Sequence, residues 1–399
     1  MNDILERWGL RPVINASGTM TSLGASRVAP EIAADIADIL GRFIEIDALQ
    51  ERASLAIAAA TGADAGFITS SSSAAITLGV AAAITGDDLA AIEALPDCRG
   101  RQRRIAIQMG HMVNYGAPVP QAIALAGAEV VPLGTAALCE TYHLEAELKA
   151  GLAAAVFIVS HHTVRDGALP LDLFIALCRD YGVPVIVDMA SEYDLTGPVA
   201  LGADVAIYSG HKFLAGPTSG IVAGTRKMVR AMYLQGRGIG RVMKVGKEGI
   251  LGAIAALEAW QQQDHQAVQA RELARVHRWI EQLAGLPGVT AATHQDWTGN
   301  PITRVELRLE PEAAGLYAWE LTARLRQGDP AIALRDDLAE HQLLYLDPCN
   351  VTDAEADLVA RSIRAACDAA RMRGDGCVQS WSSEKSARGS ATVPWLEDT

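Results

Sequence analysis

The sequence has no pair of closely spaced cysteines. Its thiols show neither a CxxC pair nor the Cys/His spacing of a metal site, so we expect no bound metal. A reduced, cytoplasmic protein is the simplest account of cysteines arranged in this way. The six cysteines are Cys98, Cys139, Cys178, Cys349, Cys367 and Cys377.

Long apolar runs and clustered positive charge are also lacking. No run approaches the roughly 20 residues that span a bilayer. The stretch 1–7 lacks the basic and then apolar pattern of a signal peptide. The formal net charge is −13, which argues against nucleic acid and anionic membranes, because both bind clustered basic surfaces. We therefore expect a small molecule, and neither nucleic acid nor membrane, as partner.

What the chain does have is apolar sequence, which makes up 50% of its 399 residues. This length accommodates a large domain and a smaller one. Seven short apolar runs alternate with helical stretches such as 171–181, and this pattern predicts a mostly parallel sheet covered by helices. Because the runs are continuous rather than alternating, we expect strands buried on both faces. The predicted strands are 65–69, 105–108, 129–133, 155–160, 183–188, 204–208 and 220–223.

From about Arg226 the pattern changes to that of a small α+β domain. We predict helices at 249–263, 267–284, 316–327 and 353–371 and strands at 303–309 and 342–346. The expected divisions are an N-terminal segment, 1–50, on the small domain and the active-site entrance, a large domain at 51–265, the small domain at 266–373 and a polar, mobile tail at 374–399. Trp381 and Trp395 would allow that tail to dock.

Lys212 is the most informative residue. It follows the predicted strand 204–208, and the preceding strand, 183–188, ends at Asp188. Taken singly, they could be a surface lysine and a strand-end cap. Together they match the needs of pyridoxal 5′-phosphate (PLP), whose aldehyde forms an imine with a lysine while a carboxylate keeps the pyridine nitrogen protonated. Glycines around Lys212 permit close approach of a ligand.

A serine cluster, Ser71, Ser72 and Ser73, lies where another predicted strand gives way to an alanine-rich helix. A helix N-terminus and serine hydroxyls suit a phosphate group. The simpler alternative is an N-cap without a ligand, but the serines exceed what one cap needs. Ser209 and His211 beside the lysine could complete the site, although His211 could equally be a satisfied core imidazole.

Other candidates contact the cofactor ring or the substrate. His111 follows strand 105–108 and could stack on the cofactor, or be an ordinary loop histidine. His162 follows strand 155–160 and could line the cleft. Arg237, Arg241 or Arg304 could hold a substrate carboxylate bidentately, and the sequence does not choose among them.

The lysine segment, Ser209–Lys212 followed by Gly-Pro-x-x-Gly at 216–220, resembles that of fold-type I, aspartate-aminotransferase-like PLP enzymes. Segments 237–248, 13–19 and 328–332 narrow the resemblance to the selenocysteine-synthase-like group. That group includes seryl-tRNA selenium transferases and D-glucosaminate-6-phosphate ammonia-lyases. The resemblance covers roughly residues 8–370.

This resemblance implies a fold-type I large domain with a mostly parallel seven-stranded sheet, a small α+β domain, PLP as cofactor and a homodimer or higher oligomer with shared active sites. It implies that Lys212 is the Schiff-base lysine, Asp188 the pyridine-nitrogen partner, His111 the stacking ring and the serine cluster the phosphate site. It also places the loop 237–248 near an active site. The chain departs from the selenium transferases in being acidic and in lacking their extra N-terminal region, so we reject aminoacyl-tRNA as substrate.

The predicted reaction is α,β-elimination of a hydroxylated amino acid or 2-amino sugar acid to a 2-keto acid and ammonia, with Lys212 as the base. Alternatives on the same scaffold are a racemase or epimerase, an aldolase, an aminotransferase or a decarboxylase. A cysteine desulfurase would require a nucleophilic cysteine, for which Cys349 is a poor candidate. A binding protein without turnover is the alternative of another class.

Overall fold

The computed structural model describes residues 4–390, 393 and 396. Trp395 and the other remaining positions of the predicted tail lie outside the described residues. The chain forms two compact units, one made of Ser26–Gln263 and the other of Met1–Ala25 together with Asp264–Thr399. Among the described residues, no helix combines the length and the hydrophobicity needed to cross a membrane.

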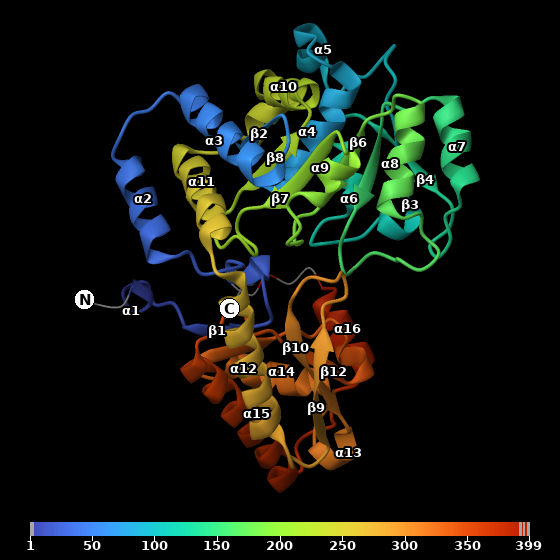
Figure 1. Cartoon of the computed structure of the whole chain (residues 1–399). Helices are drawn as coiled ribbons and strands as arrows, with labels where there is room; N and C mark the ends of the chain where they lie inside the picture. The colour runs from blue at the N-terminus through green and yellow to red at the C-terminus, as the bar shows by residue number, and fades with distance from the viewer. Residues whose placement is uncertain (1–3, 391–392, 394–395, 397–399) are drawn as a thin grey trace. The chain divides into compact units, whose positions relative to one another are not determined.

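The large unit is built on a seven-stranded sheet in the order β2-β8-β7-β6-β5-β3-β4 (Figure 1). β8 is antiparallel to both of its neighbours, and the remaining neighbours are parallel. All seven predicted strands are present, with ends within about two residues of those expected. The strands are β2 (Ala65–Thr69), β3 (Arg104–Gln108), β4 (Glu129–Leu133), β5 (Ala154–Ile158), β6 (Val185–Asp188), β7 (Val205–Ser209) and β8 (Gly220–Gly224).

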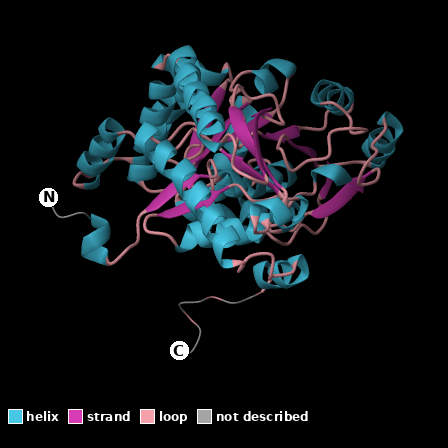
Figure 2. Ribbon diagram, turned by 90° about the horizontal axis from the view of Figure 1, so that it is seen from below, coloured by secondary structure: helices cyan, strands magenta, loops and turns pink. Residues whose placement is uncertain are grey.

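Helices cover both faces of this sheet (Figures 1 and 2). Successive side chains of a strand point to opposite faces. In β6, Val185 and Val187 belong to a core cluster with residues of α3, α7, α8 and α11, whereas Ile186 belongs to another with residues of α4, α6 and α10. The continuous apolar runs follow from this double burial. The helices of this unit are α2 (Pro30–Leu40), α3 (Ile46–Thr61), α4 (Ser72–Thr85), α5 (Leu89–Ala94), α6 (Val119–Ala124), α7 (Thr141–Ala150), α8 (Leu171–Asp180), α9 (Gly197–Leu201), α10 (Arg226–Leu234) and α11 (Lys247–Gln262), with short 3-10 helices η2 (Met109–His111), η3 (Gln235–Arg237) and η4 (Ile239–Met243).

The division into units differs from the predicted domain boundary at residue 50. Residues 26–50 belong to the large unit, because α2 and α3 both pack on α11 and bury Ile32 and Leu49 in its core. The second boundary falls between Gln263 and Asp264, two residues before the predicted one.

The small unit combines a three-stranded antiparallel sheet, β12-β10-β9, with a parallel pair, β1 and β11. Pairing of Val13–Ala16 with Ala331–Leu334 places the start of the chain on this unit, as expected of the N-terminal segment. The elements are α1 (Ile4–Trp8), β1 (Val13–Ala16), η1 (Thr21–Leu23), α12 (His265–Leu283), β9 (Val289–Gln295), β10 (Thr303–Leu309), α13 (Pro311–Ala314), α14 (Ala318–Gln327), β11 (Ala331–Leu334), η5 (Ala339–His341), β12 (Leu343–Leu346), α15 (Asp353–Arg373) and α16 (Trp381–Arg388).

The segment after Arg373 docks on the small unit. The Trp381 ring lies 5.3 Å from that of Trp319, whose indole N–H donates to the carbonyl of Gln379 at 2.9 Å. The Glu320 carboxylate accepts the backbone N–H groups of residues 377–379 at 2.8–3.0 Å. The sequence predicted a mobile tail here, with Trp381 as a possible docking residue. In the described part of this tail, Trp381 does contact the small unit.

Candidate active site

The predicted cofactor residues all belong to the large unit and follow the carboxyl ends of its strands. β3, β5, β6 and β7 are parallel, and β2 runs with them because β8 is antiparallel to both β2 and β7. Their carboxyl ends therefore share one edge of the sheet, the edge at which open α/β sheets bind ligands. The serine cluster follows β2, His111 follows β3, His162 follows β5, Asp188 ends β6, and Ser209, His211 and Lys212 lie at the end of β7.

Asp188 and Lys212 come from neighbouring strands. Asp188 is 7% exposed and lies opposite Ile207 of β7, and its carboxylate accepts the N–H of Ala190 at 3.0 Å. Burial raises the pKa of Asp188, while the positive charge of Lys212 and the Ala190 N–H oppose that rise. Since the two charges interact, the structure brings together the pair that the sequence singled out.

A tight loop presents the half-buried Lys212. The N–H of Gly210 donates to the carbonyl of Ser219 at 3.0 Å, and a Cβ at position 210 would lie 2.1 Å from the Ser219 hydroxyl oxygen. Only glycine fits such a close approach. The Ser26 hydroxyl donates to the carbonyl of His211 at 2.6 Å, so the backbone on both sides of this segment is held.

The three serines of the cluster have different surroundings. Ser71 is the N-cap of α4, and its hydroxyl oxygen accepts the N–H of Ala74 at 3.1 Å. Ser72 donates to the carbonyl of Tyr208 at 3.3 Å, and Ser73 exchanges a hydrogen bond with the Tyr115 hydroxyl at 2.9 Å. The first amides of a helix have no partner within the helix, so the N–H groups of Ser72 and Ser73 suit a phosphate.

His211 has two ring nitrogens to which a ligand could hydrogen-bond. Its side chain is buried, and within the described part of the chain neither ring nitrogen has a hydrogen-bond partner. Burial lowers the pKa of His211, and the charge of Lys212 lowers it further. Buried polar atoms without partners are costly, so a polar group of a ligand is expected beside this ring.

The residues present therefore fit PLP. Phosphate would be held by the first turn of α4 together with His211, the pyridine nitrogen by Asp188 and the aldehyde carbon by Lys212. The chain also approaches α4 closely at this end, because a Cβ at Gly220 would lie 2.3 Å from the carbonyl oxygen of Ser71.

His111, predicted to stack on the cofactor, is enclosed by other groups of the large unit. It is 2% exposed, its Nδ1 accepts the N–H of Ile158 at 3.3 Å, and its ring meets Phe157 edge-on with centroids 4.5 Å apart. Burial lowers the pKa of His111 to about 4. These contacts favour a neutral core imidazole over a ring that stacks on the cofactor.

Two residues at this edge of the sheet escaped the sequence reasoning. Tyr115, between η2 and α6, has its hydroxyl against Ser73; burial raises its pKa, and the charge of Asp188 adds to the rise. Glu192, four residues past Asp188, is 4% exposed. The position of Glu192 after a strand end was a usable signal, whereas a lone tyrosine in a polar loop carries none.

The candidate substrate residues of the large unit lie on its surface. Arg237 in η3 and Arg241 in η4 are exposed, and His162 is exposed with its ring 3.7 Å from that of His161. These arginines are thus accessible to an anionic ligand, and they remain candidates for the substrate carboxylate.

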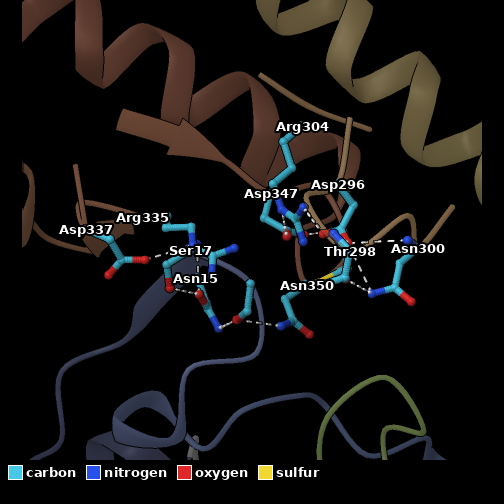
Figure 3. A network of polar contacts seen from close by, with 12 residues as sticks. Asn15, Ser17, Asp296, Thr298, Asn300, Arg304, Arg335, Asp337, Asp347 and Asn350 are labelled. Atoms are coloured by element: carbon cyan, nitrogen blue, oxygen red, sulfur yellow. Dashed lines mark hydrogen bonds and ion pairs between the residues drawn. The ribbon is translucent and has the colours of Figure 1, made fainter. Parts of the chain in front are cut away.

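Arg304 belongs to the small unit and already has two carboxylate partners (Figure 3). Its Nε donates to Asp347 at 2.7 Å and its Nη1 to Asp296 at 2.5 Å, and its side chain is 6% exposed. Burial alone would lower the pKa of Arg304, but the two carboxylates raise it. Since breaking a buried ion pair costs about 3–5 kcal/mol, this arrangement favours a structural role for Arg304 over substrate binding.

The same network holds the N-terminal segment on the small unit (Figure 3). Asn350 donates to the carbonyls of Gly18 and Ala25 at 3.1 and 2.9 Å. Gly18 has φ +91°, and a Cβ there would lie 3.0 Å from the Asp347 carboxylate. The glycine thus permits both the backbone conformation and the close approach of the buried acid.

Comparison with known proteins shows the family of this chain. The aminotransferase class-V family matches residues 45–328, which is more than half of the chain. The protein belongs to that family and is a PLP-dependent enzyme of fold type I. The seven-stranded sheet and the small antiparallel sheet agree with this class.

Two relatives cover nearly the whole chain. D-glucosaminate-6-phosphate ammonia lyase of Salmonella typhimurium is 38% identical over 362 residues, which are 91% of this chain and 97% of that protein. A solved structure of a D-glucosaminate-6-phosphate ammonia-lyase superposes with a TM-score of 0.85 at 38% identity and covers 93% of this chain and 100% of its own. The 5′-C-glycyluridine monooxygenase-decarboxylase of a Streptomyces species is 35% identical over 356 residues, 88% of this chain and 89% of that protein.

Proposed function

We propose that this enzyme is an ammonia lyase that acts by α,β-elimination on a phosphorylated 2-amino sugar acid. The observation that carries the proposal is the similarity to D-glucosaminate-6-phosphate ammonia lyase, at 38% identity over 91% of the chain and a TM-score of 0.85. The site geometry agrees, because Lys212 and Asp188 stand at neighbouring strand ends and can serve this chemistry.

The chemistry divides between the cofactor and the chain. Bound PLP supplies an electron sink for the pair left on the substrate α-carbon when a bond to it breaks. Asp188 holds the proton on the pyridine nitrogen, and the Lys212 amine removes the α-proton. The β-hydroxyl then leaves as water, with the proton that the Lys212 ammonium can return to it. Hydrolysis of the released enamine returns one water, so the net products are ammonia and a 2-keto-3-deoxy acid.

The loop 237–248 supports an anionic substrate. It carries Arg237, Arg241, Lys244 and Lys247, although the chain as a whole has a net charge of −13. Concentrated positive charge on an acidic protein attracts anions to that place. We propose that this loop contacts the substrate phosphate or carboxylate, in its own subunit or in a partner.

We further propose that the enzyme is a cytoplasmic homodimer. Phe43, between α2 and α3, is fully exposed, and Val242 in the loop 237–248 is 86% exposed. The Lys247 ammonium lies 5.9 Å from the Phe43 ring, so the two exposed segments are neighbours. Exposed apolar groups gathered in this way mark an interface. The six free cysteines suit a reduced compartment.

The test is product analysis with D-glucosaminate 6-phosphate. We expect equal amounts of ammonia and 2-keto acid from the wild-type protein, and neither from Lys212→Ala. The unphosphorylated sugar acid and D- and L-serine test whether the phosphate and the longer chain are needed. Absence of both products from every one of these substrates would exclude an ammonia lyase of this kind.

A second candidate is decarboxylation, favoured by the 35% identity to the monooxygenase-decarboxylase over 88% of this chain. The two candidates differ in the bond that breaks at the α-carbon. Release of labelled carbon dioxide from a 1-¹³C-labelled substrate, without keto acid, would support decarboxylation and exclude elimination.

A further inference from the structure

Tyr115 joins two parts of the cofactor site that the sequence treated as separate. Its hydroxyl lies 2.9 Å from the hydroxyl oxygen of Ser73, in the first turn of α4. The charge of Asp188, at the end of β6, also contributes to raising the pKa of the phenol. The hydroxyl therefore lies beside the helix N-terminus, which suits a phosphate.

The loop that carries Tyr115 is held by its own backbone. The N–H of Tyr115 donates to the carbonyl of Ala117 at 3.3 Å, and Asn114 pairs with Pro118 in an isolated bridge. The side chain of Asn114 accepts the N–H of Gly116 at 2.9 Å, and Gly116 has φ +113°. A tyrosine at the tip of such a turn presents its hydroxyl from a defined position.

The two hydroxyls have more donor capacity than their mutual bond uses. Tyr115 and Ser73 carry one hydroxyl hydrogen each, and one of these is used when one hydroxyl donates to the other. The second hydrogen is available to another acceptor. A phenol is protonated at neutral pH, so Tyr115 is able to donate.

We propose that Tyr115 donates a hydrogen bond to the phosphate of PLP and, with Ser73, closes the phosphate site at the N-terminus of α4. This inference rests on the cofactor in the proposed function and not on the identity of the substrate. Tyr115 acts as a cofactor-positioning residue, because a phosphate fixed at α4 sets where the ring lies relative to Asp188 and Lys212.

The test compares the binding of PLP and of pyridoxal, which has the same ring and aldehyde but no phosphate. Dissociation constants are measured from the absorbance that develops when Lys212 forms its imine. For Tyr115→Phe we expect PLP to bind roughly 10- to 100-fold more weakly, as for loss of a hydrogen bond to a charged group. Pyridoxal affinity should change by less than about threefold. Tyr181→Phe is the matched control, because Tyr181 is 43% exposed and Tyr115 is 41% exposed.

Two further variants sharpen the test. With Ser73→Ala already in place, Tyr115→Phe should cost less PLP affinity than it costs alone, since the two hydroxyls act as a pair. Tyr115→Ala distinguishes the hydroxyl from the ring. Equal loss of PLP and pyridoxal affinity in Tyr115→Ala, with Tyr115→Phe unchanged, would mean a stacking role and overturn the inference.

The remaining outcomes are also decisive. An unchanged preference for PLP over pyridoxal in Tyr115→Phe would overturn the phosphate contact, while the enzyme's own chemistry stayed intact. If the wild-type protein developed no absorbance with PLP at all, the cofactor assignment itself would fail. The two failures are distinguishable because only the second affects the wild type.

Discussion

Asp188 and Lys212 act on each other across adjacent parallel strands: burial raises the pKa of Asp188, and the positive charge of Lys212 opposes that rise. A buried carboxylate of this kind is stabilised by a cation placed against it. A protonated pyridine nitrogen is such a cation. The burial of Asp188 thus creates the condition under which the cofactor ring keeps its proton.

Lys212→Ala should abolish both the imine absorbance and the reaction. Because the lysine is proposed both to anchor PLP and to move the α-proton, turnover should fall by at least about 10²- to 10⁴-fold. Absorbance spectra and ammonia release measure the two effects. Lys227→Ala, at an exposed lysine in α10, is the control. Wild-type turnover in Lys212→Ala would refute the assignment.

Asp188→Asn should keep the imine absorbance but shift the pH profile. An acid beside a cation shifts a pKa by about 1–3 units, so without the carboxylate the pyridine nitrogen should lose its proton at a pH lower by a similar amount. Activity at neutral pH should therefore drop and partly recover as the pH falls. A pH–rate profile measures the shift, and a profile with unchanged limbs would contradict this role.

Phe43→Glu should convert the proposed dimer to monomers. A charge placed on an apolar contact must be desolvated when the interface forms, which costs several kcal/mol without a partner. Light scattering coupled to size-exclusion chromatography measures the mass. Leu55→Glu, at another exposed apolar residue, is the control. A wild-type protein that is already monomeric would contradict the proposed assembly.

Arg304→Ala should destabilise the small unit by about 3–5 kcal/mol, because it leaves Asp296 and Asp347 as buried charges without their cation. Arg308→Ala, which removes an exposed pair with Glu306, should cost less than about 1 kcal/mol. Urea unfolding followed by tryptophan fluorescence compares them. If Arg304→Ala instead kept the wild-type midpoint and raised the substrate KM, the arginine would bind substrate.

Glu272 should make the stability of the protein depend on pH. Burial, and next the nearby Asp347 charge, raise the pKa of Glu272 to about 7 from its ordinary 4.5. Below about pH 4.5 Glu272 is protonated in both the folded and the unfolded state, so its contribution to the stability of the fold is fully present. Between pH 4.5 and 7 the unfolded chain loses this proton first, so the stability falls, and above pH 7 the loss is complete.

Glu272→Gln removes this titration. Between pH 5 and 8 the free energy of unfolding of the wild type should fall relative to that of Glu272→Gln by about 1–3 kcal/mol, as measured from the urea midpoints. Glu340→Gln, at an exposed position, should follow the wild type at both values. A constant difference between Glu272→Gln and the wild type across this range would show that the group does not titrate there.

The strands of the large unit could be predicted because both faces are buried and each run is continuously apolar. β9 was missed because none of its residues is fully buried and weak strand formers such as Ala291 and Ala292 interrupt its pattern. The pairing of β1 with β11 joins residues more than 300 positions apart, and no local pattern encodes such a partner.

The residues of the candidate site also differ in how far they could be predicted from the sequence. The positions of Lys212, Asp188 and the serine cluster at strand ends could be predicted, because strand ends can be located from hydrophobicity. Tyr115 reaches Ser73 through a loop, so its contact depends on tertiary structure alone. Arg304 looked available because its acids, Asp296 and Asp347, lie on other segments of the small unit.

The composition of α4 has a consequence for how tightly a phosphate can be held. Most of this helix is buried, small residues are frequent in it, and a Cβ at Gly79 would lie 3.0 Å from Ile186 of the sheet. Alanine and glycine have no side-chain rotamers to freeze. The backbone amides of the first turn thus belong to a helix that is packed in the core before a ligand binds, so little backbone entropy remains to be lost on binding.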